Sequence, residues 1–405
     1  MSNYTGRVLA LLPLASLLLA SCIRDEAPNA ECDITGIEQS WIDEYKSRIV
    51  GEPIITNDRV SVTLEKGTAR TALAPRFTLT QGAWLTMTDE SGAAVEANGR
   101  TRDFSKPKIY TVHSEDGKWT KDYTVSFGFP KALSLMSFEY YDLDPSGRYY
   151  RWYEMDDADP ENPRRDYWAS GNAGFALTGM GHAPSEYPTA VEPLGRQNNC
   201  VKLVTRATGD FGSRTHMPIA AGNLFIGEFV SAQAALFPRK ATKFGLQVLG
   251  GTPVALEGYY KYKAGVTVTD KNGDVVAGAH DMADIYAVVY EVDTVTGAKF
   301  TPLNGDNVLS SDRIVMMARI DKPQEAAGEV TETATAEALA RASEWIHFSE
   351  PFRLLEGKEF SVDRLEHNGY AIAVVCTSSR DGAVFSGAVG STLFVDELLI
   401  TYEDQ

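Results

Sequence analysis

The chain has 405 residues, with 55 acidic and 38 basic side chains, so its formal net charge at pH 7 is −17. A chain this acidic repels nucleic acid and anionic lipid, and its sequence contains no basic run, which excludes nucleic-acid binding. The length is too great for one ordinary core and predicts two domains.

The first segment has the layout of an export signal. An apolar stretch from Val8 to Ala20 follows the single early charge, Arg7, and is too short to span a bilayer as a helix. It leads through Ser21 to Cys22, the order at which bacterial lipoproteins are cleaved and acylated. We expect a signal peptide over residues 1–21 and a lipid on Cys22 as the only membrane attachment. The alternative is an ordinary signal peptide that happens to contain a cysteine.

The remaining cysteines are Cys32, Cys200 and Cys376. Three is an odd number, and none of them forms a Cys-x-x-Cys pair or lies at zinc-binding spacing from a histidine. Cys200 and Cys376 lie in apolar runs typical of strands. We expect these cysteines to be buried or unreactive thiols. The alternative that the sequence leaves open is one disulfide.

Residues 22–33 are polar and predict a tether, and residues 34–130 predict a first β-domain. Apolar and polar residues alternate over 60–64, 110–114 and 123–127, which is the period of a half-buried strand. Asp116-Gly117 lies between the last two runs and is a hairpin-turn signal. About a hundred residues of short strands with such turns predict an immunoglobulin-like β-sandwich.

Residues 131–405 predict a second, larger β-domain. Its expected strands are longer, rich in aromatic residues and separated by Gly, Asn, Asp and Pro, which favours a jelly-roll sandwich. The clearest ones cover residues 200–206, 255–262, 285–292, 314–320, 370–377 and 391–402. Residues 325–343 are the exception, because their Ala- and Glu-rich part favours a helical insertion between two strands.

Six segments of this second region occur in a familiar order: 168–175, 202–206, 218–227, 258–263, 284–290 and 386–396. On these segments the region 137–402 resembles the putative carbohydrate metabolism domain (PCMD) family of Bacteroidota lipoproteins. The resemblance implies a jelly roll akin to those of carbohydrate-active proteins, with a sugar pocket. The region 34–129 resembles the immunoglobulin-like domain often placed before it, on segments 104–107 and 110–117.

Asp25-Glu26, just behind Cys22, resembles the surface-export signal of Bacteroidota lipoproteins. We therefore expect an outer-membrane lipoprotein that faces the medium.

The sequence assigns no catalytic residue. Glycoside hydrolysis usually needs two carboxylates about 5–10 Å apart. The acidic pairs at 142/144, 281/284, 291/293 and 396/397 lie in turns, at strand ends or on opposite faces, so we expect solvated turn carboxylates. Ser391 lacks the Gly-x-Ser-x-Gly context of a hydrolase nucleophile. The six histidines are scattered, and His216 alone is kept as a candidate base or ligand, with a structural or surface histidine as the favoured alternative.

No cofactor is expected. Acidic loops at residues 142–144 and 156–159 carry the oxygen ligands that Ca²⁺ prefers, so calcium is the alternative, but neither matches the spacing of an EF-hand.

Sugar recognition uses aromatic faces against the ring and planar polar groups for the hydroxyls. Seven residues of the second region meet this need and are the candidate carbohydrate-binding set: Trp168, Asn172, Arg206, Tyr260, Lys261, Tyr262 and Tyr286. On a strand, Tyr260 and Tyr262 share one face and Lys261 points to the other. The alternative is that these aromatic side chains pack in the core.

The leading hypothesis is a cell-surface lipoprotein that binds carbohydrate through a pocket in the jelly roll, with outer-membrane glycan-uptake proteins as partners. The alternatives are a glycan-cleaving enzyme whose carboxylates converge only in the folded chain, and a structural or adhesive surface protein.

Overall fold

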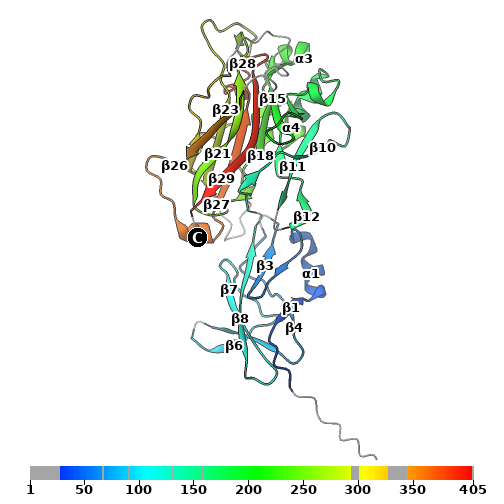
Figure 1. Cartoon of the computed structure of the whole chain (residues 1–405), viewed down its shortest axis with the longest axis vertical. Coiled ribbons are helices and arrows are strands. Elements are labelled where there is room, and N and C mark those ends of the chain that lie inside the picture. Colours follow the sequence, from blue (N-terminus) through cyan, green and yellow to red (C-terminus); the bar gives the residue numbers. More distant parts are fainter. Residues whose placement is uncertain are drawn as a thin grey trace, which may run out of the picture.

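The computed structural model describes residues 28–65, 68–89, 91–129, 131–156, 159–234, 236–292, 301–326 and 344–403. The expected signal peptide, Cys22 and nearly all of the helix-prone insertion lie outside these ranges. The described chain is an all-β, two-domain protein, as expected, and its domains are arranged end to end (Figure 1). No helix in the described ranges is long and apolar enough to cross a membrane.

The N-terminal domain is a sandwich built on one six-stranded sheet. In spatial order its strands are β2 (Ile54–Ile55), β3 (Arg59–Thr63), β8 (Thr120–Gly128), β7 (Lys108–His113), β5 (Trp84–Thr88) and β6 (Ala94–Glu96). β3 and β8 are parallel and the other neighbours antiparallel. The domain is completed by a strand pair, β1 (Ile34–Ile37) with β4 (Phe77–Leu79), and by the helix α1 (Gln39–Tyr45). The turn η1 (Lys46–Arg48) follows α1 directly.

Local sequence explains these elements. Along β3, β7 and β8 every second side chain is buried, which is the alternation that the sequence predicts. β7 and β8 are joined by a turn in which Asp116 accepts hydrogen bonds from the Ser114 hydroxyl (2.6 Å) and the Lys118 N–H (2.9 Å). Gly117 has a φ of +67°, a conformation that glycine adopts without steric cost.

The C-terminal domain is a jelly-roll sandwich of two large sheets. The first contains β13 (Trp168–Ala169), β18 (Asn223–Phe229), β27 (Tyr370–Thr377), β23 (Asp284–Glu291), β24 (Ile314–Arg319) and β26 (Arg353–Leu354), with β19 (Thr242–Phe244) and β20 (Gln247–Val248) pairing beside them. The second contains β14 (Thr189–Glu192), β15 (Cys200–Val204), β29 (Thr392–Tyr402), β21 (Pro253–Lys263) and β25 (Ile346–Pro351), with β9 (Leu135–Met136) beside β29. Most of these pairs join strands distant in the sequence.

The first sheet is buried on both faces, and this positions the site. Its inner face, with Ile285 and Ile372, packs against the inner face of the second sheet, which includes Tyr260 and Leu393. Its outer face carries Phe225, Tyr286, Tyr290 and Val375 in another apolar cluster, which is continuous with the core of the N-terminal domain. Strands buried on both faces read as unbroken apolar runs, as residues 285–290 do.

Short elements cover the outer face and the flanks. The helical turns are α2 (Asn172–Phe175), η2 (Ala176–Thr178), η3 (Pro184–Glu186), α3 (Gly209–Arg214), α4 (Ser231–Ala234), α5 (Pro238–Ala241), α7 (Val362–Glu366) and η4 (Gly382–Val384). Small pairs of strands are β16 (Arg206–Ala207) with β17 (Ile219–Ala220), and β22 (Val268–Thr269) with β28 (Gly387–Ala388). A further sheet of β10 (Tyr140–Leu143), β11 (Tyr150–Asp156) and β12 (Asp159–Arg164) stands at the side of the jelly roll (Figure 1).

Cys32, Cys200 and Cys376 are free thiols in this structure. Burial raises the pKa of all three, and Cys200 and Cys376 are fully enclosed, so they are thiols at neutral pH. Within the described ranges no group of three or more His, Cys, Asp or Glu side chains could hold a metal ion. Asp157 and Ala158, in one of the two acidic loops considered for calcium, lie outside these ranges.

Candidate functional site

A cavity of about 420 Å³ lies against the outer face of the first sheet. Its floor is formed by Phe225 of β18, Tyr286 of β23, and Val375 and Thr377 of β27. Its walls come from the short helices α2, α3, α4 and α5, from residues 305–310 and from η4. We call this space the aromatic cavity.

Aromatic and aliphatic side chains make up most of the wall: Phe175, Leu177, Phe211, Met217, Ile219, Phe229, Phe244, Val308, Leu309 and Phe385. Phe211 and Leu177 are 39% and 52% exposed, so they lie where the cavity meets solvent. Such a wall offers flat apolar faces to a ligand, as the C–H face of a sugar ring requires.

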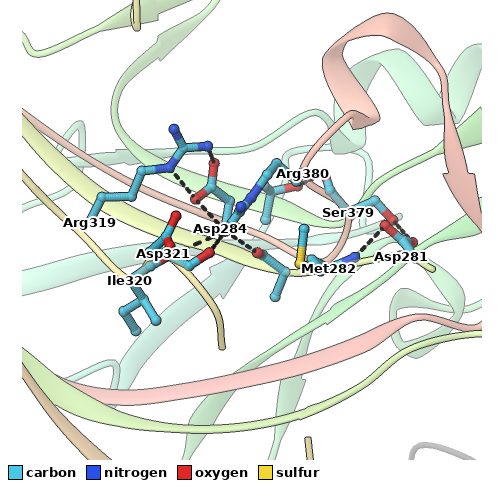
Figure 2. Close-up of polar contacts among 10 residues, drawn as sticks. Asp281, Met282, Asp284, Arg319, Ile320, Asp321, Ser379 and Arg380 are labelled. Atoms are coloured by element: carbon cyan, nitrogen blue, oxygen red, sulfur yellow. Dashed lines mark hydrogen bonds and ion pairs between the residues drawn. The ribbon is translucent and has the colours of Figure 1, made fainter. Parts of the chain in front are cut away.

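Asp284, one of the residues that line the cavity, takes part in the ion pair that Figure 2 shows. Asp284 at the start of β23 accepts hydrogen bonds from Nε (2.8 Å) and Nη2 (2.7 Å) of Arg319 at the end of β24. Arg380 approaches the same carboxylate from the other side, at 3.7 Å. Burial raises the pKa of the Asp284 carboxyl, and both guanidinium groups oppose this shift. The hydrogen bonds that Arg319 donates to Asp284 raise the pKa of Arg319. The bidentate geometry holds the pair in the ionised form.

A second buried carboxylate positions the loop that carries Arg380. Asp281 accepts hydrogen bonds from the hydroxyls of Ser379 and Ser391, both at 2.6 Å, and from the N–H of Ala388 at 2.8 Å. Burial raises the pKa of Asp281, and the donors from Ser379 and Ser391 oppose the shift. Asp281 therefore ties together two parts of the segment that carries η4 and closes one side of the cavity.

The lining contains a more exposed ion pair as well. The Arg239 guanidinium lies 3.1 Å from Asp306, and each group is about two-fifths exposed. Arg239 also donates to the carbonyl of Gly305, at 3.1 and 3.0 Å, which holds the guanidinium against residues 305–306. Planar charged groups of this kind can hydrogen-bond neighbouring hydroxyls of a sugar.

Tyr286 is the one member of the candidate carbohydrate-binding set that lines the aromatic cavity. Trp168 is buried in the core of the jelly roll, where its Nε1 donates a hydrogen bond to Glu154 (2.9 Å). Asn172 is fully buried and exchanges hydrogen bonds with the backbone of Thr189.

The other four members lie elsewhere. Arg206 is in the small strand β16, and Tyr260 and Tyr262 pack between the two large sheets. Lys261 points to the other face of β21, is 4% exposed, and lies 4.8 Å from the ring centroid of Trp345. The structure thus separates the seven residues, and their contact with sugar stays a prediction.

The expectation that Asp281, Asp284 and Asp396 are solvated is wrong. Their exposed fractions are 5%, 2% and 1%, because partners distant in sequence bury them. Sequence reasoning also missed Arg319 and Arg380. For Arg319 the available signal was a charged residue at the end of an apolar run, where it must meet a partner or leave the sheet. Arg380 follows Thr377-Ser378-Ser379 and carried no such signal.

A second concave region, of about 430 Å³, lies on the second sheet. Glu139, Glu257, Glu397, Tyr259 and His347 line it, and we call it the glutamate hollow. The Arg196 guanidinium lies 3.3 Å from the centroid of the Tyr259 ring. Nearby, Asp396 accepts a hydrogen bond from the Arg196 N–H (2.7 Å), and burial raises its pKa to about 7.

Comparisons with known proteins agree with this architecture. Residues 137–401 match the family described as the putative carbohydrate metabolism domain, and residues 45–127 match the family described as SGBP, N-terminal. The fold and these matches together define a two-domain, all-β protein with a role related to carbohydrate. The chain belongs to the PCMD family, and the resemblance inferred from the sequence is confirmed.

Two similar crystal structures are of proteins described as putative glycoside hydrolases. One, from Bacteroides thetaiotaomicron VPI-5482, is 39% identical, with a TM-score of 0.60 over 94% of this chain and 100% of its own. The other, from Bacteroides vulgatus ATCC 8482, is 35% identical, with a TM-score of 0.56 over 67% of this chain and 99% of its own. No curated protein matches the chain significantly.

Proposed function

We propose that this protein is a surface lipoprotein that binds carbohydrate in the aromatic cavity as part of glycan acquisition. The observation that carries the proposal is the cavity itself: a recess of about 420 Å³ with aromatic walls and two arginine–aspartate pairs, within the region that matches the PCMD family. The match of residues 45–127 to an SGBP N-terminal domain supports a role in surface glycan binding.

The chemistry of the cavity favours binding over cleavage. Its lining includes two carboxylates, Asp284 and Asp306, and both are in ion pairs with arginine. A general acid for glycoside hydrolysis must be free to reach the glycosidic oxygen, whereas each of these carboxylates is engaged by a guanidinium group. The same groups suit recognition, since their geometry is fixed before a ligand arrives.

The test is a glycan array with purified residues 23–405 and the variant Phe211→Ala. We expect selective binding by the unaltered protein and about tenfold weaker binding by the variant, because an aromatic contact contributes about 1 kcal/mol or more. Trp119→Ala, an exposed residue (61%) of the N-terminal domain, is the matched control and should bind normally. Equal binding by Phe211→Ala would remove the cavity from the proposal.

Attachment to the membrane is tested separately. In a bacterial host of the same phylum, Cys22→Ser should abolish acylation and release the protein from the membrane fraction, since we expect Cys22 to be the only anchor. Membrane retention of Cys22→Ser would overturn the lipoprotein assignment. Protease treatment of intact cells then reports whether the anchored protein faces the medium.

Cleavage of a glycan is the second candidate, and two observations favour it. The similar crystal structures are described as putative glycoside hydrolases, and three glutamates line the glutamate hollow. A reducing-sugar assay on every array hit tests it. Sugar release that disappears in Glu139→Gln, Glu257→Gln or Glu397→Gln, but persists in Phe211→Ala, would place an enzyme at the hollow.

A further inference from the structure

The side sheet of β10, β11 and β12 presents an exposed aromatic face. All four residues of β10 are exposed, including Tyr140 at 42%. Tyr140 pairs across the strands with Tyr153 of β11, and their rings stack at 5.8 Å between centroids. These two rings are on one face of the sheet because directly opposed residues point the same way.

Charged planar groups interleave with these rings. The guanidinium of Arg165 lies 4.5 Å from the centroid of the Tyr153 ring and also pairs with Asp142 of β10. Arg151 of β11, which faces Asp142 across the strands, lies 3.8 Å from Asp166. Two arginines and two aspartates leave this patch without net charge. We call Tyr140, Asp142, Arg151, Tyr153, Arg165 and Asp166 the tyrosine surface.

On β11 the opposite face of the same sheet is anchored. Trp152 alternates with Arg151 and Tyr153 along β11, is 1% exposed, and belongs to the core of the jelly roll. Glu154, 2% exposed, accepts a hydrogen bond from the Trp168 indole. The tyrosine surface is therefore held on a fixed support, which lowers the conformational entropy lost on binding.

We propose that the tyrosine surface is a second carbohydrate-contact site that takes an uncharged polysaccharide. An exposed ring accepts the apolar face of a sugar, and the adjacent arginines and aspartates supply donors and acceptors for its hydroxyls. The balance of charge fits a neutral chain better than an anionic one, for which the aspartates would be repulsive. The inference shares its ligand class with the proposed function and uses a separate set of residues.

The position of the surface favours a long ligand. In the turn between β10 and β11, the Tyr149 ring lies 5.4 Å from Tyr187, and Tyr187 lies 5.5 Å from Phe175 in the wall of the aromatic cavity. Tyr187 is 1% exposed, so this row of aromatic contacts packs the hairpin directly against the wall of the cavity and brings the two candidate sites near each other. A polysaccharide that occupies both sites gains from the high effective concentration of the second contact.

The experiment is native electrophoresis of purified residues 23–405 through gels containing starch, xyloglucan, mannan or galactan, with polygalacturonate as the anionic comparison. Tyr140→Ala and Tyr153→Ala are compared with Phe211→Ala in the cavity and with the control Trp119→Ala. Thermal unfolding of each variant checks its fold, and the glycan array measures binding of short sugars.

We expect at least one neutral polysaccharide to slow the unaltered protein and Trp119→Ala, and the dissociation constant of Tyr140→Ala to rise about fivefold. Binding of short sugars should be weakened, about tenfold, only in Phe211→Ala. Equal retardation of Tyr140→Ala and the unaltered protein would overturn this inference and leave the cavity intact. Loss of polysaccharide binding in Tyr140→Ala, together with full binding by Phe211→Ala, would instead overturn the proposal that the cavity binds carbohydrate.

Two further outcomes overturn the inference. One is that no neutral polysaccharide slows the protein, or that polygalacturonate alone slows it. The other is a dimer, seen by light scattering, that Tyr140→Ala dissociates, because the surface would then join two copies of the chain.

Discussion

At the scale of single residues, the buried carboxylates divide into groups held ionised and groups that burial drives toward the protonated form. Asp284 has two guanidinium partners, whereas Glu154 has neutral donors from Trp168 and Ser137. Burial raises the pKa of Glu154 to about 7. The difference in partners decides how each group contributes to stability.

For Asp284, we expect Asp284→Asn to lower the free energy of unfolding by about 3 kcal/mol, because it leaves the Arg319 charge without its counterion at a site that is 28% exposed. Urea denaturation measures the change. The control is Glu96→Gln, which breaks the exposed pair with Arg100 and should cost less than about 0.5 kcal/mol. Equal costs for the two variants would show that the Asp284 pair stabilises the fold no more than an exposed ion pair does.

For Glu154, the pH dependence has a definite sign. The folded pKa of about 7 lies above the ordinary value of 4.5, so between these values the folded state binds more protons than the unfolded state. The contribution of Glu154 to stability is therefore present below pH 4.5 and is lost as the pH rises through 7.

We expect the unfolding free energy of the unaltered protein, relative to Glu154→Gln, to fall by roughly 3 kcal/mol from pH 4.5 to 7.5. Gln keeps an acceptor for the Trp168 indole and cannot ionise. Chemical denaturation of both proteins across this range checks the slope, and a difference that does not change with pH contradicts the assigned pKa.

At the scale of elements, β27 is the strand on which the cavity and the core both depend. It pairs with β18, β20 and β23, and its alternate residues face the sandwich core and the aromatic cavity. A void in this strand cannot close by a small movement, because both faces of the strand are packed.

We expect Ile372→Ala in β27 to cost about 3 kcal/mol of unfolding free energy, since Ile372 is fully buried and its removal leaves a cavity. Leu354→Ala, in the edge strand β26 and 50% exposed, should cost well below about 1 kcal/mol. Guanidinium denaturation followed by tryptophan fluorescence compares them. Similar losses in both would mean that the sheet tolerates voids at its centre.

At the scale of the whole molecule, Arg70 joins the two domains. It is 1% exposed and donates to the Phe127 carbonyl in its own domain (3.1 Å) and to the His367 carbonyl after α7 (2.8 Å). Its guanidinium also lies 4.9 Å from the ring centroid of Phe129. Lys106 and Asp363 form a second, exposed contact across the junction, at 2.9 Å.

We expect Arg70→Met to loosen the junction, because the stem of the side chain stays while both carbonyls lose a charged donor. Small-angle X-ray scattering should give a larger radius of gyration, and proteolysis near residue 130 should be faster. Lys106→Met, which removes only the exposed pair, should behave like the unaltered protein. A scattering curve of Arg70→Met that matches the unaltered protein contradicts a role for Arg70 at the junction.

The sequence by itself determined the longest strands and the family. Strand β27 (Tyr370–Thr377) has the bounds that its apolar run predicts, and β24 (Ile314–Arg319) differs from its prediction by one residue. Alternation and turn residues such as Gly117 act between near neighbours in the chain, so they are legible without the fold. The order of motifs along 137–402 was sufficient for the PCMD resemblance.

Only the tertiary structure decided which faces became a site. The period of a strand predicts that Tyr260 and Tyr262 share a face. Only the structure shows that this face lies in the core, whereas Tyr286 faces the aromatic cavity. Asp284 meets Arg319 and Arg380 because β23, β24 and β27 lie side by side in the first sheet. Such contacts depend on pairing between strands distant in sequence, and no local pattern carries that information.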